Sequence, residues 1–160
     1  MDIFIHGLDS SNRGTKSVFF RKRFPGMLTP HFRGSLQERM AKLEGILTGQ
    51  SGIRLVGSSF GGLMASIFAM QHESRVDRLI LLAPAIHVIG DIPYSVRKIS
   101  LPVHIYHGTN DTVIPLKAVN REAKRFFHNL TFIPVDDDHY LHRTFKDIDW
   151  TAFLGSKEIA

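Results

Sequence analysis

Short, almost continuous apolar segments alternate along this chain with longer segments of helical periodicity. Runs such as Leu79-Ile80-Leu81-Leu82 are typical of strands buried on both faces of a parallel sheet. The predicted strands are Asp2–Ile5, Met27–Thr29, Ile53–Val56, Arg78–Leu82, Val103–Tyr106 and Leu130–Val135. The predicted helices are Thr15–Phe24, Phe60–Gln71, Leu116–Phe127 and Leu141–Leu154. A further helix is predicted to begin at the capping box Ser35-Leu36-Gln37-Glu38 and to continue to Leu47. This alternation predicts an α/β fold: a three-layer α/β/α sandwich around a mostly parallel sheet of about six strands.

Length and composition narrow the classes of protein that need to be considered. A length of 160 residues predicts a single domain, and the absence of cysteine excludes disulfides, thiolate catalysis and cysteine-ligated zinc. No signal peptide or apolar stretch of transmembrane length is visible, so we expect a cytoplasmic chain without a membrane span. The formal charge of +5 is interpreted as solvated helix faces, and no nucleic-acid partner is expected.

The sequence Gly57-Ser58-Ser59-Phe60-Gly61 has the form G-x-S-x-G. It lies between a predicted strand and a predicted helix, which is the context in which this motif lifts a serine hydroxyl above the edge of a sheet. An isolated match would more often be an ordinary Gly/Ser turn. The strand and helix on either side favour Ser59 as a nucleophile.

A serine hydroxyl needs a base to take its proton, and two further strand ends supply an acid and a base. Asp111 follows the strand Val103–Tyr106, and His139 follows Leu130–Val135. The order Ser, Asp, His is the one used by hydrolases built on such a sheet. Ser59 would attack, His139 would shuttle the proton, and Asp111 would orient the imidazole. Asp138 competes with Asp111, but adjacent side chains rarely orient each other productively, so Asp111 is preferred.

Backbone amides complete the predicted site. Leu8 follows the first predicted strand, and Phe60 follows the nucleophile. Their N–H groups are the predicted oxyanion hole. Ile86 and Ile114 lie near predicted strand ends and are predicted to line the substrate pocket. His139 and His142 are three residues apart, but a full metal-ligand set is not evident, so no metal site is predicted.

These segments together resemble the α/β-hydrolase superfamily. The residues that carry the resemblance are His6-Gly7-Leu8-Asp9-Ser10-Ser11, the Gly57–Gly61 motif, His107–Pro115 and Asp138-His139. The segment His6–Lys16 is similar to small bacterial serine esterases. The resemblance implies hydrolysis of carboxylic esters through an acyl-enzyme, without metal or organic cofactor. It also implies the strand order 2-1-3-4-5-6. Only Ala85–Ser100 stands where many relatives insert a cap domain, so we expect a capless, open site.

The leading functional prediction is therefore a serine carboxylesterase acting on short-chain or exposed esters, with a small-molecule ester or acyl compound as its substrate. Two alternatives remain open. The same three residues would serve a thioesterase, amidase or peptidase, because the fold does not select the bond. A non-catalytic interaction protein on a hydrolase scaffold is the alternative from a different class. The oligomeric state is not predicted.

Overall fold

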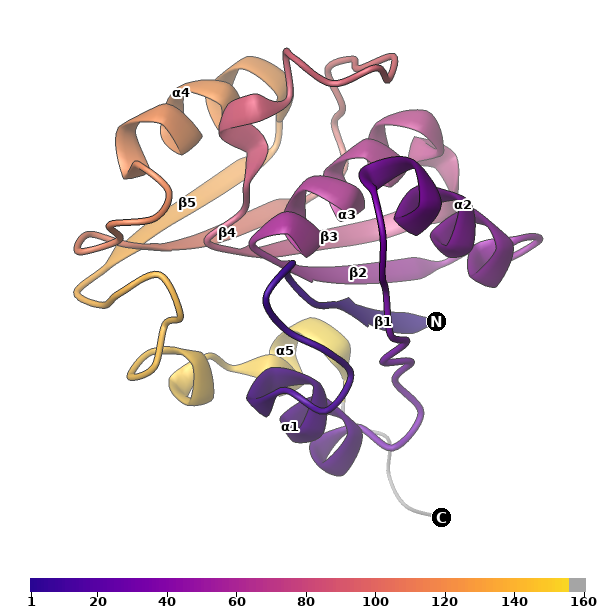
Figure 1. The fold of residues 1–160 in the computed structure, drawn as a ribbon, viewed down its shortest axis with the longest axis horizontal. Helices are drawn as coiled ribbons and strands as arrows, with labels where there is room; N and C mark the ends of the chain where they lie inside the picture. Colours follow the sequence, from indigo (N-terminus) through magenta and orange to yellow (C-terminus); the bar gives the residue numbers. More distant parts are fainter. Residues whose placement is uncertain (156–160) are drawn as a thin grey trace.

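The computed structural model describes residues 1–155, which form a parallel sheet with helices on both faces (Figure 1). The strands are β1 (Asp2–Ile5), β2 (Ile53–Ser58), β3 (Val76–Leu82), β4 (Val103–Gly108) and β5 (Leu130–Val135). The helices are α1 (Thr15–Arg23), α2 (Leu36–Leu47), α3 (Phe60–Gln71), α4 (Leu116–Phe126) and α5 (Trp150–Leu154), with short 3-10 helices η1 (Glu73–Arg75), η2 (Ile86–Val88) and η3 (Phe145–Asp147).

The sheet contains five strands in the order β1-β2-β3-β4-β5, and every neighbouring pair is parallel. The predicted strand Met27–Thr29 is reduced to one bridge, in which Leu28 pairs with Ile3 beside β1. Pro30 follows closely and has no N–H with which to extend a ladder. The expected count of about six strands is therefore corrected to five. The bridged segment still occupies the position that the strand order 2-1-3-4-5-6 assigns to it.

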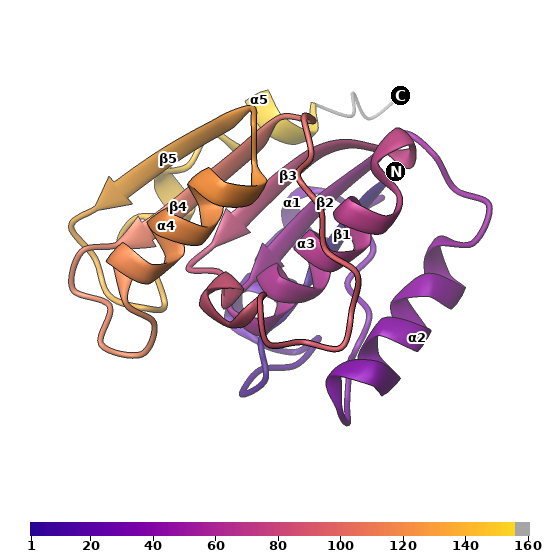
Figure 2. The same ribbon diagram turned by 90° about the horizontal axis from the view of Figure 1, so that it is seen from above.

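Side chains alternate between the two faces of the sheet and form two apolar layers, which confirms the three-layer prediction. Figure 2 shows α2, α3 and α4 together on one face and α1 and α5 on the other. Ile5, Leu55 and Leu81 pack on the first face, whereas Phe4, Val56 and Leu82 pack on the second. The strands are nearly continuous apolar runs because both faces are covered.

The predicted capping box at the start of α2 is present. The Ser35 hydroxyl accepts from the Glu38 amide at 3.2 Å, and the Glu38 carboxylate accepts from the Ser35 amide at 2.7 Å. The predicted helix Leu141–Leu154 is wrong. Leu141 has φ 53°, and the segment contains η3 and α5 with irregular chain around them.

Parallel strands end at the same edge of the sheet, and the loops that follow β1, β2, β4 and β5 meet there. Between β3 and β4 the described chain forms only η2 and connecting loops, and no cap domain. Within residues 1–155, no helix combines the length and apolar character needed to cross a bilayer.

Candidate active site

Ser59 lies on a sharp turn between the end of β2 and the start of α3. Its backbone has φ 54° and ψ −118°, a conformation that costs a non-glycine residue about 1–3 kcal/mol. Three backbone hydrogen bonds hold the turn. The Ser59 amide donates to the Leu82 carbonyl, and the Ser59 carbonyl accepts from the amides of Gly62 and Ala85, each at 2.9 Å.

Close packing explains the glycines around Ser59. A Cβ atom on Gly57 would lie 2.5 Å from the Gly61 carbonyl oxygen, and one on Gly62 would lie 2.7 Å from the Pro84 side chain. A Cβ atom on Gly61 would overlap the carbonyl oxygen of Ile5. The motif therefore brings α3 against the ends of β1 and β3, and so fixes where Ser59 stands.

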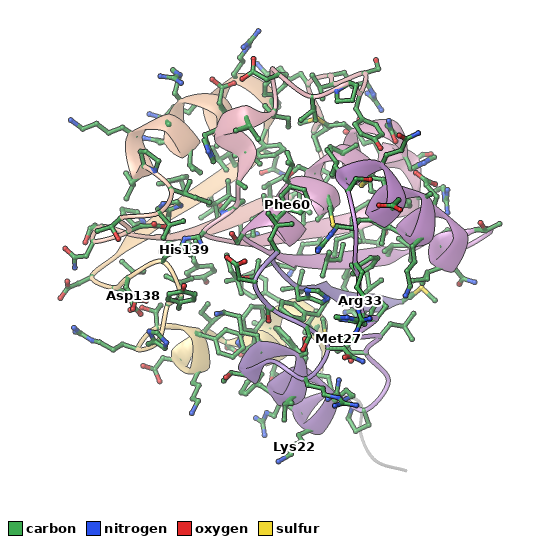
Figure 3. The ribbon with its side chains drawn as sticks, in the orientation of Figure 1. Lys22, Met27, Arg33, Phe60, Asp138 and His139 are labelled. Atoms are coloured by element: carbon green, nitrogen blue, oxygen red, sulfur yellow. The ribbon has the colours of Figure 1, made fainter. Side chains whose placement is uncertain are left out.

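The structure brings Ser59, His139 and Asp111 into one chain of hydrogen bonds. The His139 Nε2 atom lies 3.1 Å from Ser59 Oγ, and its Nδ1 atom lies 2.7 Å from Asp111 Oδ2. A carboxylate only accepts, so Nδ1 carries the proton and Nε2 is free to accept from the serine hydroxyl. The His139 side chain is 9% exposed and that of Asp111 is fully buried. Figure 3 labels His139 on the loop after β5 and Phe60 at the start of α3.

Asp111 is held from both of its carboxylate oxygens. Its Oδ1 atom accepts from the amides of Val113 and Ile114, both at 2.8 Å. Its Oδ2 atom lies 3.2 Å from His107 Nε2 in addition to its contact with His139. The two amides therefore hold the carboxylate independently of His139.

Sequence reasoning missed the role of His107. This imidazole is fully buried, and its Nε2 atom lies 2.9 Å from the Ile114 carbonyl, so Nε2 carries the proton. Burial lowers the pKa of His107, although the Ile114 carbonyl and Asp111 oppose that shift. The spacing of four residues between His107 and Asp111 was visible in the sequence, but only the turn after β4 shows that the two side chains meet.

Asp138 has different partners. Its Oδ2 atom lies 2.7 Å from His142 Nδ1, and its Oδ1 atom accepts from the Tyr140 amide at 2.9 Å. Both side chains of the Asp138–His142 pair are substantially exposed. The geometry therefore favours Asp111 as the partner of His139. Among residues 1–155, no three histidine, aspartate or glutamate side chains cluster in a way that would hold a metal ion.

His6 fixes the loop that carries the Leu8 amide. The buried His6 ring accepts the Phe32 amide proton at Nε2 (3.0 Å), so Nδ1 carries the proton and donates to the Gly7 carbonyl at 2.7 Å. Burial lowers the pKa of His6, which favours this neutral form. The peptide is trans, so the Leu8 N–H points away from the carbonyl that His6 holds.

Gly7 packs directly against the nucleophile, since a Cβ atom there would lie 3.2 Å from Ser59 Cβ. Leu8 follows Gly7, and Phe60 is the first residue of α3, where a backbone N–H has no partner within the helix. Both residues line the same pocket as Ser59 and His139. The two predicted oxyanion donors therefore belong to segments that adjoin the serine.

The pocket around Ser59 has a volume of about 690 Å³, within the range of small-molecule sites. Ile114 is among the residues that line it. Ile86 does not line it: its side chain is only 1% exposed and packs in the core on the α3 side. The turn of η2 directs Ile86 inward, and its neighbours Ala85, His87 and Val88 line the pocket instead.

Comparison with known proteins agrees with this architecture. A family model of the α/β hydrolase fold matches residues 31–98, and no curated protein sequence matches the chain. A protein from Xanthomonas campestris, described as a hydrolase of the α/β superfamily, is similar in structure with a TM-score of 0.76, 22% identity and coverage of 92% of this chain and 93% of that one.

Two further solved structures are similar. Alpha/beta hydrolase domain-containing protein 10 from mouse has a TM-score of 0.74 at 18% identity, with 86% of this chain and 81% of that chain covered. Est1E from Butyrivibrio proteoclasticus has a TM-score of 0.71 at 18% identity, with 91% and 82% covered. Together with the parallel sheet and the strand–serine–helix turn, these matches show that the chain has the α/β-hydrolase fold.

Proposed function

We propose that this protein is a serine hydrolase that cleaves carboxylic esters through an acyl-enzyme. Ser59 is the nucleophile, His139 the general base and acid, and Asp111 the residue that orients and stabilises the imidazolium. The observation that carries the proposal is the unbroken chain from Ser59 Oγ through His139 to Asp111, with distances of 3.1 and 2.7 Å.

The reaction follows from the proton positions. Ser59 Oγ attacks the ester carbonyl while its proton passes to His139 Nε2. The resulting imidazolium gives that proton to the departing alkoxide, which leaves as the alcohol, and the acyl group remains on Ser59. Water then attacks the acyl-enzyme with His139 again as the base. The carboxylic acid leaves, and Ser59 regains its proton.

Negative charge develops on the carbonyl oxygen in each of these steps. The backbone N–H groups of Leu8 and Phe60 are the proposed donors to it, and loss of one such donor costs about a hundred- to a thousandfold in rate. The α3 N-terminus adds a favourable dipole at the same place. His6 supports this arrangement by holding the Gly7 carbonyl away from the site.

The proposed substrate is a carboxylic ester with an apolar acyl group, and the apolar surface beside Ser59 supports the acyl part of this proposal. Phe60, Val88, Val113 and Ile114 line it. Matched butyryl ester, thioester and amide substrates test this choice of bond. The ester should have the highest kcat/KM, and a clear preference for the thioester or amide would replace the carboxylesterase assignment while keeping the serine mechanism.

The deciding experiment is reaction with a fluorophosphonate probe, followed by peptide mass spectrometry. We expect a single adduct on Ser59. Ser59→Ala should remove this adduct. His139→Ala should slow adduct formation by several orders of magnitude, because loss of such a residue lowers turnover by roughly a millionfold.

Ser51→Ala and His128→Ala are the matched controls, because both residues are exposed and do not line the pocket. They should react like the unmodified protein. Absence of any adduct in folded protein would overturn the proposal and favour a non-catalytic interaction protein on this scaffold.

A further inference from the structure

The pocket continues past Ser59 and His139 to the other face of the sheet. Its apolar residues Phe60 and Val88 come from α3 and η2. Lys16 and Lys146 line it from α1 and η3. Figure 1 shows α1 and α5 on the opposite side of the sheet from α3 and α4. The pocket therefore runs from an apolar side at α3 and η2 to a side at α1 and η3, with Ser59 and His139 between them. On the α1 side the two lysines lie beside the apolar residues Phe4, Leu141 and Phe145.

Lys16 is held in place within this pocket. Its Nζ atom donates to the Tyr140 carbonyl at 2.6 Å and lies 5.3 Å from the centre of the Phe145 ring. An ammonium group has three N–H donors, and one is used by Tyr140. Within residues 1–155, no carboxylate lies within ion-pair distance of Lys16. The half-buried ammonium thus keeps donors available to a bound molecule.

The charged residues around Lys16 are of both signs. Of the lining residues that carry a full charge at neutral pH, Lys16 and Lys146 are cationic and Asp9 is acidic; Asp9 and Lys146 are both exposed, and Lys16 is half-buried. Burial lowers the pKa of Lys16, and Asp138 and Asp137 oppose that shift because they favour its charged form. A half-buried ammonium with N–H donors to spare can make a charge-assisted hydrogen bond to an anionic group, which is stronger than one between neutral groups.

Lys16 lies beside the loop that carries His139. The carbonyl that binds its ammonium belongs to Tyr140, the residue after His139. In the proposed mechanism His139 delivers the proton to the departing oxygen, so that oxygen must lie near His139. A substituent on the leaving group then extends toward the loop that holds Lys16, and the acyl group remains beside the apolar residues.

We propose that Lys16 binds an anionic oxygen group, a carboxylate or a phosphate, on the leaving-group part of the substrate. Preferred substrates are then esters whose alcohol carries a negative charge and whose acyl part is apolar. This inference rests on the proposed serine esterase function, and adds to it a specificity-determining residue and a class of leaving group.

The test compares two esters of the same shape that differ in charge. These are 4-(butyryloxy)benzoate, whose leaving group carries a carboxylate, and 4-(butyryloxy)benzamide, whose leaving group is neutral. Lys16→Met should lower kcat/KM for the benzoate by about tenfold to a hundredfold, the usual range for losing a hydrogen bond to a charged group. The benzamide should change by less than about threefold, because it gains little from the ammonium.

Two variants control for other effects of the substitution. Lys16→Arg keeps the charge and should restore most of the preference for the benzoate. Lys98→Met removes one exposed positive charge at the amino end of the sheet and should leave both substrates unaffected. Labelling of Ser59 by the fluorophosphonate probe reports whether each variant keeps a working nucleophile.

The outcomes separate the two proposals. Equal losses for benzoate and benzamide, or no loss for either, would overturn the role of Lys16 while Ser59 labelling still supports the esterase. If the unmodified protein neither reacts with the probe nor hydrolyses either ester, the esterase proposal fails and this inference fails with it.

Discussion

Asp111→Asn is the substitution whose effect follows most directly from the geometry. The carboxylate accepts from the amides of Val113 and Ile114 on Oδ1 and from His139 Nδ1 on Oδ2. His107 Nε2, which donates to the Ile114 carbonyl, lies 3.2 Å from the same Oδ2. An asparagine has one accepting oxygen and one NH2 group that donates. The NH2 group therefore faces either the two backbone amides or His139 Nδ1.

The size of the effect can be estimated from those lost hydrogen bonds. When the NH2 group faces the backbone amides, two donors lose their acceptor at about 1–3 kcal/mol each, so the free energy of unfolding falls by about 2–6 kcal/mol. When the NH2 group faces His139, the amides keep their acceptor and activity falls instead. An NH2 group facing His139 leaves the imidazole with its proton on Nε2, where it cannot accept from Ser59, and such a tautomer change lowers kcat about ten-thousandfold.

Two assays measure the two effects. Turnover of p-nitrophenyl butyrate gives kcat, and urea unfolding followed by fluorescence of Trp150, the single tryptophan and a buried one, gives the free energy of unfolding. Asp138→Asn is the matched comparison, because Asp138 is bonded to His142 and Tyr140, and it should lower kcat less than about tenfold. Asp111→Asn protein with kcat within tenfold of the original and unchanged stability would refute the reasoning.

Two further predictions concern packing and pH. Gly61→Ala should destabilise the fold strongly, because its Cβ would overlap the Ile5 carbonyl. Gly45→Ala lies in α2 with no atom within 4 Å of the new Cβ and should stabilise the fold by about 0.4–1 kcal/mol. Urea unfolding measures the stability of both variants, and similar values for the two would contradict this prediction. Burial lowers the pKa of His6 and of His107 below 6.5. As the pH falls, the unfolded chain therefore binds protons at these residues at a higher pH than the folded chain does. Their contribution to stability should be complete above pH 6.5 and should decrease as the pH falls from there through their folded-state pKa values. Urea titrations at a series of pH values measure this, and a free energy of unfolding that does not change with pH over that range would contradict it.

Much of the architecture could be predicted from the sequence because a parallel sheet constrains its own pattern. Buried strands read as apolar runs, and their carboxyl ends must share an edge, so Ser59, Asp111 and His139 could be expected near one another from their places after three strands. The hydrogen bonds that join them are seen only in the structure. His107 was not predicted because its contact with Asp111 depends on how the loop after β4 turns.

The wrong helix prediction has a physical cause in side-chain hydrogen bonding. Residues Leu141–Leu154 have apolar positions that suit a helix, but the Asp137 carboxylate accepts from the amides of Arg143 and Thr144 at 2.9 and 2.7 Å. Asp149 then caps α5 by accepting from the Ala152 amide. Such local bonds give the backbone an alternative to a continuous helix, and periodicity alone does not reveal them.

The same acidic segment explains how an irregular loop can hold His139 in place. Asp137 is 4% exposed, and its three amide contacts, including that of Asp138 at 2.8 Å, tie the two ends of the loop together. Asp136 accepts from the Asn110 side chain at 3.0 Å, and the Asn110 amide donates to the Asp137 carbonyl at 3.1 Å. Asn110 precedes Asp111, so these bonds join the loop of the acid to the loop of the base. These contacts hold the two loops together in addition to the bonds that the Asp111 carboxylate accepts from Val113 and Ile114, and none of them requires a bound substrate.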